Sequence, residues 1–248
     1  MKNILSGIKA YFGAFELISK LKLWKYFAVP MLISFFTAVL IGVAAYGLSD
    51  TMGFFISKLW IWNWGKETFT AIANIIGGLF IIIIGLILFK HIILALSAPF
   101  MSPVSEKIES YLVGEIQTRR KTSFTEQLWR GIRVNIRNLS FEMLLTIPIL
   151  LLGFIPVIGV FSTLLLLLVQ AYYAGFGNMD YTLERHFKYN ESIQFVKKNR
   201  GIAIGNGIIF ILFLLIPVIG VILVLPFSVT AASVKTIEAL QSNNKIIK

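Results

Sequence analysis

The pentapeptide Ile-Pro-Val-Ile-Gly occurs twice, at residues 155–159 and 216–220, each time inside a long run of Leu, Ile, Val and Phe. Proline cannot continue the hydrogen bonding of a helix, and glycine readily adopts the left-handed conformations that reverse a chain. Each copy therefore predicts a tight turn between two apolar helices. The predicted turn residues are Pro156, Gly159, Pro217 and Gly220.

The apolar runs beside these turns are short for a membrane crossing. Residues 143–155 form a run of about 13, roughly 20 Å as a helix, whereas a bilayer core is about 30 Å thick. The run at 157–176 is long enough, but those at 201–216 and 221–234 have only about 16 and 14 residues. Two interpretations fit: hairpins that dip partly into the membrane, or spanning hairpins whose mismatch is absorbed by tilt and local thinning.

Composition places the chain among integral membrane proteins, since 57% of its residues are hydrophobic and only 14% are charged. It has no cysteine, which excludes disulfides, thiolate metal sites and cysteine nucleophiles. No removable signal peptide is expected at the N-terminus. We assign the net charge of +11 to membrane topology and anionic lipid headgroups rather than to nucleic acid.

The first hundred residues predict a surface helix and two long spans. Residues 1–25 combine lysines with apolar residues at helical spacing, which indicates an amphipathic helix on the cytoplasmic membrane surface. Transmembrane helices are expected at 27–48 and 70–98, joined by an external loop at 49–69 whose tryptophans anchor at the interface. At the end of the second span, we expect Lys90 to snorkel toward water and His91 to be interfacial.

Residues 102–141 predict cytoplasmic amphipathic helices. Ser102 and Pro103 suggest the start of the first, from which Glu106 and Glu109 project. Ser123 and Glu126 form a capping box that opens the second. The remaining chain is expected to comprise hairpin 1 at 143–176, a cytoplasmic segment at 178–200, hairpin 2 at 201–235 and a tail at 236–248, all in one membrane domain of residues 1–248.

Arg130, Arg133 and Arg137 recur on one face of the second amphipathic helix. Three interpretations remain open for this row: a solvated or lipid-facing surface, a salt-bridge network with Glu106 and Glu109, or part of an anion pathway. The loop between the two long spans has few lysines, whereas the other polar segments are rich in Lys and Arg. Both chain termini are therefore predicted to be cytoplasmic.

The order of these features resembles the CysZ-type sulfate permeases, within the superfamily of etoposide-induced membrane proteins. The resemblance rests on the basic start before Pro30, the two long spans, Ala98-Pro99-Phe100 followed by Glu106 and Glu109, both proline turns, Asp180-Tyr181 and Leu225-Pro226. It implies an all-α fold with two long transmembrane helices and two partly penetrating hairpins. It also implies a bacterial inner-membrane protein that passes sulfate inward for cysteine biosynthesis.

In this family a Gly-Leu-Arg stretch before the proline, often with a second basic residue, is associated with sulfate. The matching positions here are Lys22-Leu23-Trp24, followed by Lys25, so the glycine and the first arginine are absent. Lysine is a point charge without the two-pronged geometry of arginine. The resemblance nevertheless implies an anion site at Lys22, Leu23, Trp24 and Lys25.

Two functions are compared at this stage. The first is a permease for sulfate or a related oxyanion. The alternative is a non-transporting scaffold whose basic surface helices bind membrane lipids and whose hairpins shape one leaflet. An enzyme is not expected, because the spans lack a Ser-His-Asp order, an HExxH pair and a carboxylate dyad. We expect membrane lipids as partners and a homo-oligomer of two or more chains, with no cofactor and no metal.

Overall fold

The computed structural model describes residues 2–62, 64–114, 120, 122–153, 155, 158–216 and 219–242. Within these ranges the chain is helical and contains no strand. The helices are α1 (Lys2–Lys9), α2 (Ala14–Lys20), α3 (Trp24–Ser57), α4 (Lys66–Leu96), α5 (Ala98–Val113), α6 (Phe124–Gly153), α7 (Ile158–Leu183), α8 (Tyr189–Lys198), α9 (Arg200–Leu214) and α10 (Ile219–Ser242). In the described part of the chain, five segments are long and apolar enough to cross a membrane: α3, α4, α6, α7 and residues 222–242 of α10.

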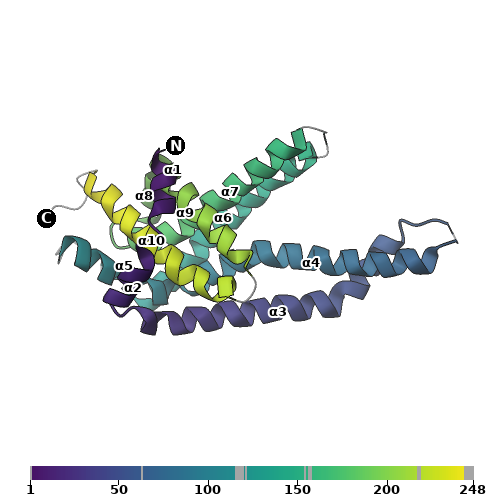
Figure 1. Cartoon of the computed structure of the whole chain (residues 1–248), viewed down its shortest axis with the longest axis horizontal. Helices are drawn as coiled ribbons and strands as arrows, with labels where there is room; N and C mark the ends of the chain where they lie inside the picture. Colours follow the sequence, from purple (N-terminus) through teal and green to yellow (C-terminus); the bar gives the residue numbers. More distant parts are fainter. Residues whose placement is uncertain are drawn as a thin grey trace.

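Helices α3 and α4 lie side by side as a long arm that projects from the other helices (Figure 1). They contain 34 and 31 residues, about 51 and 46 Å at the usual helical rise. Small residues allow the close contact between them, because a Cβ atom at Gly77 would lie 2.8 Å from the backbone N of Gly53. The arm exposes many large apolar side chains, as expected of helices that face lipid.

A second arm, formed by α6 and α7, points in a different direction (Figure 1). The sequence suggested a boundary between residues 141 and 143, but α6 runs without interruption for 30 residues. The amphipathic segment and the first arm of hairpin 1 are therefore one helix. The polar residue at this point, Glu142, is buried rather than exposed as a helix boundary would be.

The two hairpin turns differ in detail from the sequence-based expectation. Pro156 and Pro217 lie outside the described residues. Gly159 and Gly220 belong to α7 and α10, and neither has a positive φ. A Cβ atom at Gly159 would lie 2.8 Å from the carbonyl O of Gly153 on the opposite arm, and one at Gly220 would overlap the carbonyl O of Phe213. These glycines permit close approach of the two arms, not a left-handed turn.

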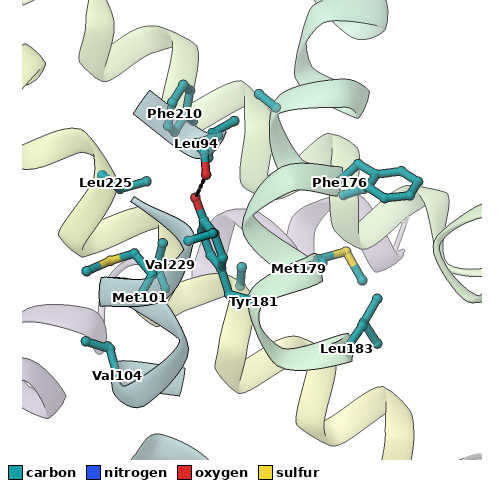
Figure 2. Close-up of a cluster of buried hydrophobic side chains, with 14 of the residues drawn as sticks. Leu94, Met101, Val104, Phe176, Met179, Tyr181, Leu183, Phe210, Leu225 and Val229 are labelled. Atoms are coloured by element: carbon teal, nitrogen blue, oxygen red, sulfur yellow. Dashed lines mark hydrogen bonds between the residues drawn. The ribbon is translucent and has the colours of Figure 1, made fainter. Parts of the chain in front are cut away.

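The core surrounds the C-terminal half of α7, which is buried from Tyr173 to Leu183. Figure 2 shows Tyr181 in this core, among side chains from α4, α5, α9 and α10. Its hydroxyl donates a 2.6 Å hydrogen bond to the carbonyl O of Leu94. Helix α7 also packs closely against α9, since a Cβ atom at Gly207 would overlap the backbone of Ala171.

The N-terminal segment forms two short helices where one was expected, and both pack on the bundle. Gly7 of α1 lies against α9, where an added Cβ atom would be 2.7 Å from the carbonyl O of Ile202. The Tyr11 hydroxyl donates a 2.8 Å hydrogen bond to the carbonyl O of Asn206. Ala14 and Ile18 of α2 are buried. The segment is therefore fixed to the protein through both helices.

Candidate functional site

Lys22, Leu23, Trp24 and Lys25 form the turn from α2 into α3. Lys22 has a φ of 51°, in the left-handed region, which lets the chain reverse direction between the two helices. Leu23 is fully buried, and its N–H donates to the carbonyl O of Ile18 at 2.9 Å. Leu23 thus anchors the turn and presents no side chain to solvent.

The start of α3 has the elements of an anion site. Within the described chain, no hydrogen bond uses the backbone N–H of Trp24 or Lys25, the first two residues of the helix. Such free N–H groups and the helix dipole together favour anions. Lys22 and Lys25 are exposed beside them.

Neighbouring side chains hold this turn in place. The Trp24 ring makes edge contacts with Phe15, Phe27 and Phe227, at centroid distances of 6.2, 6.1 and 6.4 Å. The Lys25 ammonium lies 5.3 Å from the centroid of the Tyr26 ring, and the Lys107 ammonium from α5 lies 5.4 Å from the same centroid. Lys107 is therefore a further cation near the turn, which the sequence did not indicate because it lies about 80 residues away along the chain.

A buried ion cluster joins α4 to α6. The Lys90 ammonium lies 2.5 Å from Glu142 Oε1, and His91 Nε2 lies 3.1 Å from Glu142 Oε2. All three residues are at most 4% exposed. The expectations that Lys90 snorkels to water and that His91 is interfacial are therefore wrong. The counter-charge that makes their burial possible comes from a helix about 50 residues further along the chain.

The arginine row of α6 is divided among different partners. Arg130 forms a two-pronged pair with the Asp180 carboxylate, both contacts at 2.9 Å, and also donates to the Ser192 hydroxyl at 2.6 Å. Arg133 stacks over the Tyr189 ring at 4.0 Å. Arg137 lies 4.9 Å from the Phe141 ring centroid and 5.4 Å from that of Phe176.

The two glutamates of α5 have different environments. Glu109 is fully buried, 3.1 Å from Arg185 Nη2 and 2.7 Å from His186 Nε2. Its partners thus come from the residues that follow α7 rather than from the arginine row. Glu106 is exposed.

Ser102 serves a different purpose from the predicted helix cap. Helix α5 already begins at Ala98, and the Ser102 hydroxyl donates a short hydrogen bond to the buried Glu184 carboxylate. Burial raises the pKa of Glu184 to about 7, and the negative charge of Asp180 adds to this effect. The bond from Ser102 opposes it.

The charged core was largely missed from the sequence. Its unpredicted members are Lys90, His91, Glu142, Asp180, Glu184, Arg185 and His186. One signal was available for Lys90 and Glu142, because an ionisable residue within an apolar run needs an internal partner. The pairing itself could not be derived, since it depends on how α4 and α6 pack.

The charged core and the turn at the start of α3 differ in how they could bind an oxyanion. In the described core, Lys90, Arg130 and Arg185 each pair with a carboxylate, so a dianion could bind there only by displacing one. The space enclosed by Asn135, Asp180 and Glu184 leaves no room for a water molecule. The turn at the start of α3 instead offers N–H groups and lysines open to solvent. Across the described ranges, no cluster of three or more histidine or acidic side chains could hold a metal ion.

Comparison with known proteins gives a consistent result. The sequence model of the family described as sulfate transporter CysZ/etoposide-induced protein 2.4 matches residues 10–225. Two curated proteins from Pseudomonas aeruginosa, strains LESB58 and PAO1, are each 24% identical to the chain over 242 residues. The match covers 92% of this chain and 93% of each relative, and both relatives are named "Sulfate transporter CysZ". Together with its five apolar helices, this similarity makes the chain a multi-pass membrane protein.

Proposed function

The chain belongs to the sulfate transporter CysZ/etoposide-induced protein 2.4 family, and on that premise we propose that it is a permease for sulfate or a related oxyanion. It would act in the bacterial inner membrane and supply sulfur for cysteine biosynthesis. The observation that carries the proposal is the match over residues 10–225, which includes both the basic turn and the charged core. The named relatives are transporters rather than enzymes, and the family does not favour a non-transporting scaffold.

We assign the first contact with the anion to the turn at the start of α3. The N–H groups of Trp24 and Lys25 would replace part of the water around the anion, and Lys22 and Lys25 would supply positive charge. Both lysines are exposed, so water weakens their attraction for the anion. Binding would therefore be weak enough for release, which a conducting protein requires.

We also propose that α3 and α4 cross the membrane, while the hairpin of α9 and α10 penetrates it only in part. Helix α9 has 15 residues, about 22 Å, which is less than the bilayer core of about 30 Å. Because α9 is short, its C-terminal end and the partial charges there would lie inside the membrane, an arrangement suited to ion handling. Both termini would face the cytoplasm, and the protein would form a homo-oligomer.

Uptake of radiolabelled sulfate into proteoliposomes tests this function. We expect the purified protein to admit more sulfate than empty vesicles. Replacing both Lys22 and Lys25 by glutamine should raise the sulfate concentration that gives half-maximal uptake by up to about 30-fold, if each lysine contributes roughly 1 kcal/mol to binding. The matched control, Lys66→Gln with Lys197→Gln, removes the same charge from other exposed positions and should keep full uptake. Uptake equal to that of empty vesicles would refute the proposal.

A further inference from the structure

A groove of about 620 Å³ lies between the N-terminal helices and the bundle. Its walls come from α1, α2, the end of α5 and the last turns of α10. Four lysines and one glutamate provide its charged groups: Lys2, Lys9, Lys20, Lys235 and Glu16. The groove therefore has an excess of positive charge. It is separate from the anion site proposed at the start of α3.

The lysines of the groove differ in their partners. Lys20 donates a 2.6 Å hydrogen bond to the Tyr111 hydroxyl, which also raises the pKa of Lys20 and keeps it charged. Lys235 pairs with Glu238 at 2.7 Å. Among the described residues, Lys2 and Lys9 form no ion pair. Glu16 is the one carboxylate in the groove lining, and neither of these two ammonium groups is within ion-pair distance of it.

Much of the remaining groove lining is apolar. Leu5, Leu17, Leu112 and Val234 line it, and Leu5 is 53% exposed. Phe12, in the turn between α1 and α2, and Phe15, in α2, are 86% and 59% exposed. A site for a small free anion needs no apolar lining, whereas a lipid presents a charged headgroup and acyl chains together.

The position of the groove also suits a lipid. Helix α2 ends at Lys20, and α3, which is long and apolar enough to cross a membrane, begins at Trp24. The groove therefore lies at the level where the chain enters the bilayer. Lysines at this level attract anionic phospholipids.

We propose that this groove binds one anionic phospholipid, with the headgroup phosphate between Lys9 and Lys20 and an acyl chain along Leu17 and Leu112. Because Tyr11, Ala14 and Ile18 fix the two N-terminal helices to the bundle, the groove is held open without the lipid. Bound lipid would connect α1 and α2 to α5 and α10.

Native mass spectrometry of the purified full-length chain tests this site. When phosphatidylglycerol and phosphatidylcholine with identical acyl chains are both supplied, we expect the protein to retain one phosphatidylglycerol molecule in preference to phosphatidylcholine. The double substitution Lys9→Gln with Lys20→Gln should weaken this retention about 30-fold, at roughly 1 kcal/mol for each lysine. Lys9→Arg with Lys20→Arg should retain the lipid, and so should the control Lys66→Gln with Lys197→Gln.

Three outcomes would overturn the proposal. The first is equal retention of the two lipids by the native chain, and the second is unchanged retention by the glutamine variant. The third is displacement of the lipid by micromolar inorganic phosphate or sulfate, which would show a site for free oxyanions. If the glutamine variant fails to fold by size-exclusion chromatography, Lys2→Gln with Lys9→Gln replaces it, since neither side chain forms an ion pair in the described chain. None of these readouts depends on sulfate transport.

Discussion

Single residues hold the described helices through two kinds of polar contact, a local bond at the start of α6 and buried ion pairs such as Lys90–Glu142 between helices. One bond of the predicted capping box is confirmed, since the Glu126 N–H donates to the Ser123 hydroxyl at 3.2 Å, while the Glu126 carboxylate pairs with Arg120. That contact is local, so spacing along the chain is enough to predict it. The Lys90–Glu142 pair is not local, and isolated positions gave no indication of which carboxylate meets which cation.

Glu142 offers a direct test of the buried cluster. Glu142→Gln leaves Lys90 buried without a counter-charge, and we expect a loss of about 3 to 5 kcal/mol in stability. Thermal unfolding in detergent, followed by size-exclusion chromatography, measures this loss. Lys90→Met with Glu142→Leu should recover most of the stability, because no unpaired charge then remains. The control Glu126→Gln breaks the exposed pair with Arg120 and should cost at most about 1 kcal/mol. Equal effects of the two glutamine substitutions would contradict this account.

Glu184 predicts a pH dependence of stability. Its pKa is about 7 in the folded protein and 4.5 as the ordinary value, so the unfolded chain loses this proton first as the pH rises. The stability contributed by this group therefore falls by about 3 kcal/mol in total between about pH 4.5 and pH 7. Above pH 7 it stays at this lower value.

Glu184→Gln should remove this dependence, because the amide carries no charge and its oxygen still accepts the Ser102 hydrogen bond. We expect the variant to be more stable than the native chain at pH 8, with the difference shrinking toward pH 5. Unfolding temperatures across this range provide the measurement. Parallel pH profiles for the two proteins would show that the native carboxyl is already ionised at pH 5.

At the scale of helices, the sequence predicted the existence of elements better than their boundaries. Long apolar runs identified α3 and α4 as helices, since few structures other than a helix satisfy the backbone in lipid. The continuity of α6 was missed because Glu142 resembles a polar boundary when its partner is unknown. The small residues between α7 and α9 were also missed, because glycine in a helix indicates close packing only once its neighbour is identified.

Gly207 tests that helix contact. A Cβ atom there would overlap the backbone of Ala171, so Gly207→Ala must separate α7 from α9, at a cost of about 1 to 3 kcal/mol or more. The matched control is Gly47→Ala, an exposed position of α3 with nothing within 4 Å of the added atom. There the higher helix propensity of alanine should leave stability unchanged or raise it by up to about 1 kcal/mol. Comparable destabilisation by both substitutions would contradict close packing of these helices.

In the molecule as a whole, charge distribution predicts sidedness, whereas the depth of each hairpin depends on helix lengths that can only be approximated from apolar runs. The first hairpin shows the difficulty, because its first arm belongs to a helix of 30 residues rather than to a run of about 13. The second hairpin keeps a short arm in α9. It is therefore the better place to distinguish partial penetration from spanning.

Cysteine labelling in intact cells makes that distinction, and the native chain has no cysteine that would react. The three positions for single substitutions are Trp62 between α3 and α4, Lys197 on α8, and Leu215 at the end of α9, all of them exposed.

A membrane-impermeant maleimide added outside should label Trp62→Cys. It should label Lys197→Cys only after the cells are permeabilised, because that segment is proposed to be cytoplasmic. Leu215→Cys should react poorly in both conditions, since the tip of a partly penetrating hairpin lies in the bilayer core, away from water. Rapid labelling of Leu215→Cys from outside would instead show that α9 and α10 reach the far surface, and the proposed transport route would then have to pass between spanning helices.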